Sequence, residues 1–221
     1  MRSSVLLGSA AILLLTSTAW AGAYAPLPSA DKQASGLQVR VVRYTGGTNG
    51  EMLVEVKNPT ARPVSFSAEG LYFIPEGDPE KAPQRLGAAG PFLVQREGTW
   101  KSAQALPLAA RTAARLRLQV FCIDSHRASP TAQHAFRLAA QRLPKALRAE
   151  IEGGAKRALG QYRAMPAAKS AIQSNVWQAR DRAWIKLDGE RAEEKSSLPR
   201  GQRRLQRRYL HVEPQPMQQA R

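Results

Sequence analysis

The clearest pattern in the sequence is an alternation of apolar and polar side chains over residues 114–122. The first set consists of Ala114, Leu116, Leu118, Val120 and Cys122, and the intervening set of Arg115, Arg117, Gln119 and Phe121. Successive side chains of a β-strand point to opposite faces of the sheet. This period of two therefore predicts a strand with one buried face.

Shorter runs of β-branched and aromatic residues precede this strand. They cover residues 37–44, 52–56, 64–68, 71–74 and 92–95, and a glycine-rich turn at 46–50 joins the first two as a hairpin. Short strands separated by turn residues are typical of antiparallel sandwiches. We therefore predict an immunoglobulin-like β-sandwich over residues 36–124.

The pattern changes after Pro130, where Ala, Leu, Gln and Arg dominate. Apolar residues recur at helical intervals from Phe136 to Leu147, although Pro144 must kink or divide a helix there. Gly153 and Gly154 are expected to end it. The residues 129–186 are predicted to form a small helical subdomain, which makes the fold α+β overall.

A second helix is better specified by its sequence. Pro166 suits the first turn of a helix, because its missing N–H would have no helical partner there. An apolar stripe follows at four-, seven- and eleven-residue spacing, formed by Ile172, Val176, Ala179 and Ala183. The helix is predicted to run to about Trp184.

The N-terminal residues 1–21 have the order of a secretory signal peptide. Arg2 is followed by an apolar run from Val5 to Leu15, and Ala19-Trp20-Ala21 forms a small-x-small cleavage site. The alternative is a membrane anchor, but the apolar run is shorter than the roughly 20 residues of a spanning helix. We expect a mature protein that is secreted, periplasmic or on the cell surface.

The chain is strongly basic, with a formal net charge of +16. Beyond residue 188 the apolar content falls, and the tail of residues 189–221 is expected to be disordered. Its basic cluster is a candidate anion-binding site, formed by Arg200, Arg203, Arg204, Arg207 and Arg208. In an exported protein, an anionic glycan, an anionic lipid or an acidic protein is a more plausible partner for these arginines than nucleic acid.

Several kinds of chemistry have no signature in the sequence. Cys122 is the only cysteine, so an intrachain disulfide is excluded. The three histidines show no zinc-ligand spacing, and we expect no metal and no cofactor. Serine-hydrolase, phosphate-loop and paired-carboxylate motifs are also missing, so an enzyme is not expected.

Two short motifs carry a resemblance to a known family. Val120-Phe121-Cys122-Ile123-Asp124 ends the longest predicted strand, and Ala171-Ile172-Gln173-Ser174-Asn175-Val176-Trp177 lies on the second helix. Together they resemble the bacterial surface thioester domains, which have an aromatic-Cys-aliphatic motif followed by Thr-Gln-x-Ala-aliphatic-Trp. Ile172 and Asn175 replace the usual Thr and Ala. The resemblance implies an internal thioester between Cys122 and Gln173, with Phe121 and Trp177 as supporting packing residues.

Two hypotheses follow for the function of this exported protein. In the first, the Cys122–Gln173 bond attaches the protein covalently to an amine or hydroxyl on a partner. In the second, Cys122 is an inert core thiol, as unpaired cysteines often are, and binding is non-covalent through the basic tail. Only the first hypothesis requires Gln173 to lie within bonding distance of Cys122.

Overall fold

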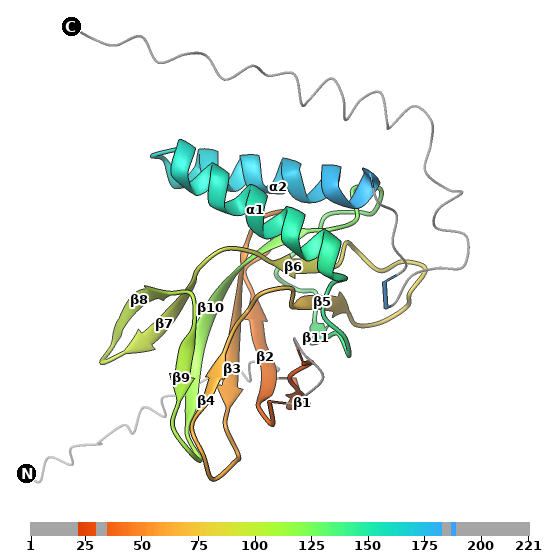
Figure 1. The fold of residues 1–221 in the computed structure, drawn as a ribbon. Coiled ribbons are helices and arrows are strands. Elements are labelled where there is room, and N and C mark those ends of the chain that lie inside the picture. Colours follow the sequence, from red (N-terminus) through yellow and green to blue (C-terminus); the bar gives the residue numbers. More distant parts are fainter. Residues whose placement is uncertain (1–21, 30–34, 183–186, 189–221) are drawn as a thin grey trace, which may run out of the picture.

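The structure is a computed structural model that describes residues 22–29, 35–182 and 187–188 of the 221-residue chain. Within these residues the fold is α+β, with a nearly closed antiparallel sheet of nine strands, a separate two-stranded ribbon, and two helices across one end of the sheet (Figure 1). The elements are β1 (Ala25–Pro26), β2 (Gln38–Tyr44), β3 (Glu51–Lys57), β4 (Val64–Phe66), β5 (Tyr72–Pro75), β6 (Leu86–Ala88), β7 (Phe92–Arg96), β8 (Thr99–Ala103), β9 (Leu106–Leu108), β10 (Ala113–Cys122), β11 (Phe136–Leu138), α1 (Lys145–Gln161) and α2 (Met165–Arg182).

The predicted alternating strand is confirmed as β10, the longest strand of the sheet. One edge of β10 pairs with β3 along residues 113–119. The other edge pairs first with β7, at Leu116 and Arg117, and then with β6, at residues 120–122. As a result, β10 connects the body of the sheet to the end that lies under the helices.

The other five predicted strands are also confirmed, as β2, β3, β4, β5 and β7, with small shifts at their ends. β2 and β3 form the predicted hairpin, which contains a bulge between Val41 and Arg43. Five strands were not predicted from the sequence: β1, β6, β8, β9 and β11. Three of these have only three residues, which is too short for a period of two to stand out.

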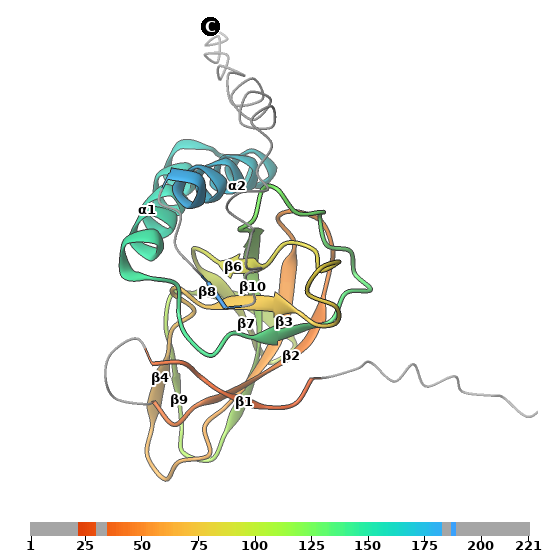
Figure 2. The same ribbon diagram turned by 90° about the vertical axis from the view of Figure 1, so that its right-hand side faces the viewer.

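The sheet has the strand order β1-β2-β3-β10-β6-β5-β11, with the β7–β8 hairpin branching from β10 (Figures 1 and 2). Tyr44 of β2 and Phe136 of β11 pack edge to face, with ring centroids 5.3 Å apart. This contact brings β11, the last strand in the order, against β2 without a ladder of hydrogen bonds between them. The coarser prediction of a sheet-rich α+β fold is confirmed, whereas the immunoglobulin-like sandwich is not.

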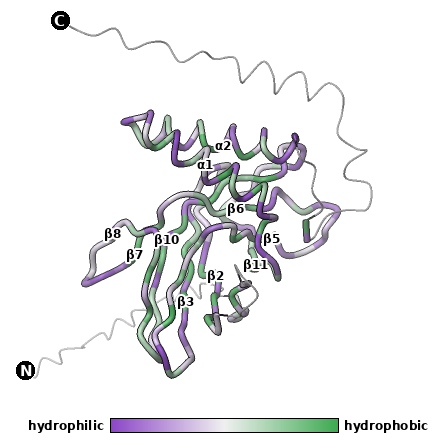
Figure 3. Tube along the Cα trace, viewed as in Figure 1, coloured by the Kyte–Doolittle hydropathy of each residue, from purple (hydrophilic) through white to green (hydrophobic). Residues whose placement is uncertain are grey.

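The buried apolar residues form two clusters. The first fills the inside of the sheet and includes Met52, Val54 and Leu118. The second lies between the helices and the end of the sheet, where Phe121 and Ile123 meet Ile151 of α1 and the apolar stripe of α2. Hydropathy accordingly varies from residue to residue along β3 and β10 (Figure 3).

The prediction for the first helix was wrong at both ends. Residues 136–138 form β11, which pairs with β5, and α1 begins only after Pro144. The helix then continues through Gly153 and Gly154 to Gln161. A Cβ at Gly154 would lie 3.0 Å from Nδ2 of Asn175 on α2, so the glycine allows a close approach of the two helices.

The second predicted helix is confirmed as α2, with Pro166 in its first turn. Ile172, Val176 and Ala179 of the predicted stripe are buried, while Ala183 and Trp184 lie outside the described residues. Beyond α2, Leu187 is buried in the second cluster, and the main-chain N–H of Asp188 donates to the Tyr72 hydroxyl at 3.2 Å.

The predicted signal peptide and the predicted basic tail, including its five arginines, lie outside the described residues. Among the helices that the structure describes, none is long and apolar enough to cross a membrane.

Candidate functional site

The candidate site is the junction between the end of β10 and helix α2. Cys122 is the last residue of β10, and none of its surface is exposed. Its side chain belongs to the cluster inside the sheet, whereas its neighbours Phe121 and Ile123 pack under the helices. This follows from the alternation of a strand, which turns Cys122 toward the interior of the sheet.

Gln173 of α2 contacts the main chain of Cys122 directly. Its Nε2 donates to the Cys122 carbonyl at 2.8 Å, and its Oε1 accepts from the Cys122 N–H at 2.9 Å. That N–H is shared with the carbonyl of Thr48, also at 2.9 Å. The structure therefore brings together the two residues predicted to react, although the contact runs through the main chain of Cys122.

Trp177 lies one helical turn beyond Gln173 and faces the same end of the sheet. Its ring packs against the cluster inside the sheet, and its Nε1 donates to Oε1 of Gln84 at 3.1 Å. Phe121, the other predicted packing residue, is buried under the helices. Both residues therefore pack at the junction, on different sides of Cys122.

A buried ion pair adjoins the two motifs and was not predicted. Arg85, which precedes β6, donates to both carboxylate oxygens of Asp124, with Nε 2.7 Å from Oδ2 and Nη2 2.6 Å from Oδ1. Neither side chain is exposed to solvent. Nε of Arg180, one further turn along α2, lies 3.8 Å from Oδ1 of Asp124. The polar side chains of α2 thus contact the end of β10 at Gln173, the segment before β6 at Trp177, and the residues after β10 at Arg180.

Arg85 also holds the chain that follows α2. Its Nη1 donates to the carbonyl of Asp188 at 3.0 Å. One guanidinium therefore links the segment before β6, the residue two positions after Cys122, and the residue that follows Leu187. Nothing in the sequence indicated this arrangement, because Arg85 lies in a short segment with no periodicity and its partner is 39 residues away.

The surroundings of Cys122 disfavour its ionised form. Burial, reinforced by the negative charge of Asp124, raises the pKa of the Cys122 thiol to about 12. The free thiol is therefore almost entirely protonated at neutral pH. Since the thiolate is the reactive form of cysteine, the thiol reacts slowly unless a reaction partner is held against it.

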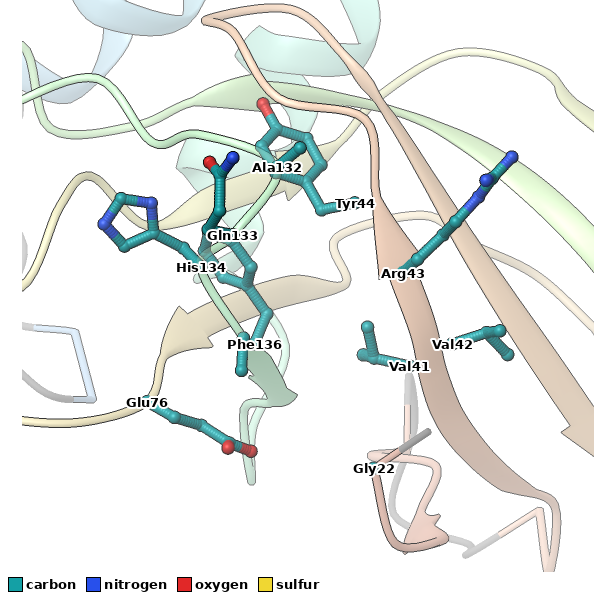
Figure 4. A pocket seen from close by; sticks show the side chains of 11 residues that line it. Gly22, Val41, Val42, Arg43, Tyr44, Glu76, Ala132, Gln133, His134 and Phe136 are labelled. Atoms are coloured by element: carbon teal, nitrogen blue, oxygen red, sulfur yellow. The ribbon is translucent and has the colours of Figure 1, made fainter. Parts of the chain in front are cut away.

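A pocket of about 430 Å³ lies beside Tyr44 (Figure 4). Val41, Tyr44 and Phe136 contribute apolar surface to it, and Glu76 and His134 contribute polar groups. The Tyr44 hydroxyl donates to the carbonyl of Gly47, next to the Thr48 carbonyl that Cys122 contacts. Tyr44 thus lines the pocket and belongs to the same core cluster as Cys122.

In the part of the chain that the structure describes, no group of three or more His, Cys, Asp or Glu side chains could hold a metal ion. Comparison with protein-family models, with curated proteins and with solved structures gives no match for this chain.

Proposed function

We propose that this chain is an exported bacterial binding module that forms an internal thioester between Cys122 and Gln173 and uses it to attach covalently to a partner. The contact between the Gln173 carboxamide and Cys122 carries the proposal. The two residues are 51 positions apart in the sequence, and the family resemblance pairs the same two residues. The finer classification of the sheet as immunoglobulin-like, which the strand pattern of the sequence favours, is part of this proposal.

The reaction uses groups that already lie at the junction. Sγ of Cys122 attacks Cδ of Gln173, a C–S bond forms, and the bond from Cδ to Nε2 breaks. The thiol proton leaves with the nitrogen as ammonia, so no oxidant or cofactor is needed. In the second step an amine or hydroxyl of the partner attacks Cδ, and Cys122 regains its proton as the thiol leaves.

The main-chain N–H of Cys122 supports the first step. It donates to Oε1 of Gln173, the oxygen on which negative charge develops when sulfur attacks Cδ. Oε1 is retained in the thioester, so this hydrogen bond can persist in the product. Only the hydrogen bond from Nε2 to the Cys122 carbonyl is lost with the ammonia.

The sulfur must move for the bond to form. The side chains of a strand point out of the plane of the sheet, whereas its main-chain N–H and C=O groups lie in that plane. Gln173 binds the main-chain groups of Cys122, so it approaches within the plane and not from the side to which Sγ points. Rotation about the Cα–Cβ bond of Cys122 turns Sγ from the interior of the sheet toward the strand edge. The same burial then protects the thioester from water, because Gln173 is only 4% exposed.

A partner nucleophile needs a route to this buried bond. The pocket beside Tyr44 supports such a route, because residues that line it, Tyr44 among them, belong to the core cluster that contains Cys122. Figure 4 shows the Arg43 side chain directed away from the other lining residues, so the approach past Val41 and Phe136 is not blocked by it.

The test uses a fluorescent primary amine and the mature protein. After incubation and denaturation, the native protein is expected to retain fluorescence that boiling in detergent does not remove. Cys122→Ala and Gln173→Ala should retain none. Equal labelling of all three proteins, or no labelling of any, would contradict the proposal. A matched control is Gln178→Ala, which changes an exposed glutamine on the same helix.

A second function is favoured by the high pKa and complete burial of the Cys122 thiol. In this alternative Gln173 acts only as a structural clamp, and the protein binds anionic glycan, anionic lipid or acidic protein through its basic tail. Truncation after Asp188 would then remove binding, and Cys122→Ala would leave it unchanged.

A further inference from the structure

The outward side of the sheet carries a positively charged surface that the thioester does not use. Because side chains alternate, the residues between the core positions of β2, β3 and β10 point away from the interior. We name this surface the outer sheet face. It consists of Arg40, Glu51, Glu55, Lys57, Arg115 and Arg117, with Tyr24 and Trp100 at its two sides.

Basic groups outnumber carboxylates on the outer sheet face by four to two. Glu55 accepts hydrogen bonds from Arg40, at 3.0 Å, and from the Tyr24 hydroxyl, and it lies 3.8 Å from Arg115. Glu51 is bound by Gln119 at 2.9 Å and lies 4.0 Å from Arg117. Each carboxylate is therefore shared among several donors. Because four basic side chains face only two carboxylates, positive charge remains in excess on the outer sheet face.

Aromatic rings hold three of the four cations in place. The guanidinium of Arg117 lies 4.1 Å from the centroid of the Trp100 ring. The Arg40 guanidinium lies 4.9 Å and the Lys57 ammonium 5.7 Å from the centroid of the Tyr24 ring. Such contacts orient cations on a surface while leaving them accessible. The side chains of Arg115 and Arg117 are 61% and 37% exposed.

We propose that the outer sheet face binds a linear acidic polysaccharide. Residues two apart along a strand are separated by about 7 Å, and neighbouring strands by about 4.8 Å, so a rigid sheet presents cations at regular intervals. A polymer with carboxylate or sulfate groups at regular intervals can contact several of them at once. Trp100 offers apolar ring surface beside these cations, against which a sugar ring can pack.

The outer sheet face is less suited to a lipid surface. Among the described residues, the large apolar side chain that is clearly exposed is Met165, at the start of α2. This residue lies at the helical end, so the outer sheet face has no comparable side chain to insert into a bilayer. The proposal does not involve Cys122 or Gln173 and does not depend on the thioester.

The test measures binding of the full mature protein to polygalacturonate, with neutral dextran as the uncharged probe, by calorimetry at several salt concentrations. Arg115→Gln/Arg117→Gln should weaken binding to polygalacturonate by about tenfold or more, because two charge-assisted contacts are lost. Trp100→Ala should weaken it as well. Arg157→Gln/Arg163→Gln removes the same charge from the helical end and should change the affinity by less than about twofold.

Two results would overturn the proposal. An equal loss in both double variants would mean that overall charge, and not this face, determines binding. Binding to vesicles of phosphatidylglycerol and phosphatidylcholine that depends on Arg115 and Arg117, without binding to polygalacturonate, would assign the face to lipid. Unchanged circular dichroism and melting temperature in each variant would exclude misfolding as the cause.

Discussion

Gln173 holds Cys122 by both of its main-chain polar groups, with its amide nitrogen 2.8 Å from the Cys122 carbonyl and its amide oxygen 2.9 Å from the Cys122 nitrogen. A helix residue thereby takes the place of a neighbouring strand at the end of β10. Both groups are buried, so the contact stabilises the docking of α2 on the sheet in addition to its proposed chemical role.

The first prediction concerns the stability that this clamp supplies. In the Cys122→Ala background, where no thioester can form and Gln173 keeps its amide, Gln173→Leu should lower the free energy of unfolding by about 2–3 kcal/mol, because the buried main-chain carbonyl at position 122 loses its donor. Urea unfolding of the mature protein measures the change. In the same background, Gln178→Leu, on the exposed side of the same helix, should stay within about 0.5 kcal/mol of Cys122→Ala. Equal stabilities for the two variants would show that the clamp contributes nothing.

The second prediction concerns the buried ion pair. Asp124→Asn should destabilise the fold by about 3–5 kcal/mol, because it leaves the Arg85 and Arg180 guanidiniums without their carboxylate. Arg182→Gln tests an exposed ion pair on the same helix, with Glu150 at 3.6 Å, and should cost less than about 1 kcal/mol. Urea unfolding measures both variants. If Asp124→Asn and Arg182→Gln lowered the free energy of unfolding by similar amounts, the buried pair would have no special role in stability.

The third prediction concerns Glu152 of α1. Burial raises the pKa of Glu152 to about 6, although its carboxylate accepts a hydrogen bond from the Gly90 N–H at 3.2 Å. In the unfolded chain the pKa of Glu152 has its ordinary value of 4.5, so the unfolded chain loses the carboxyl proton at lower pH than the folded protein does. The folded state is therefore progressively destabilised as pH rises from about 4.5 to 6, and it stays destabilised above pH 6.

Glu152→Gln keeps an acceptor for Gly90 and removes the buried charge. It should therefore raise the free energy of unfolding by about 1 kcal/mol at pH 7, allowing for partial solvent screening, and by much less at pH 4. Unfolding curves at the two pH values give the comparison. If Glu152→Gln raised the free energy of unfolding equally at pH 4 and pH 7, the raised pKa of Glu152 could not be the origin of the effect.

The fourth prediction concerns the rate at which the thioester forms. Since the pKa of the Cys122 thiol is about 12, the thiolate fraction grows about tenfold for each pH unit below that value. Ammonia release after refolding from denaturant should therefore accelerate about tenfold per unit between pH 7 and 9. Mass spectra taken over time report the rate, and a rate independent of pH would mean that thiolate formation does not limit the reaction.

The sequence predicted the elements whose signals are local. The alternation over residues 114–122 needed no tertiary information, and the four-residue spacing of Gln173 and Trp177 on a helix was sufficient to put both side chains on one face of α2. Phe136 was misassigned because its spacing to Leu143 and Leu147 fits a helix. Its pairing with Pro75 of β5, far away in the sequence, determines the observed strand.

The remaining features depend on contacts that sequence periodicity does not encode. Gly153 and Gly154 were interpreted as a helix end, since glycine is unfavourable inside helices. Asn175 packs against Gly154 from the neighbouring helix, and this close contact explains why the helix continues. Arg85 and Asp124 were missed for the same reason, because nothing in either local segment indicates that the other is its partner.

The most direct test of the proposed thioester is the intact mass of the purified mature protein, measured before any amine is added and compared with Cys122→Ala. If the thioester is present, the unaltered protein is lighter than its sequence mass by one ammonia, and treatment with methylamine adds the mass of one methylamine to it. Cys122→Ala has its full sequence mass before and after methylamine. A full sequence mass for the unaltered protein, with a Cys122 thiol that becomes reactive only on unfolding, would contradict the thioester and leave Gln173 as a structural clamp.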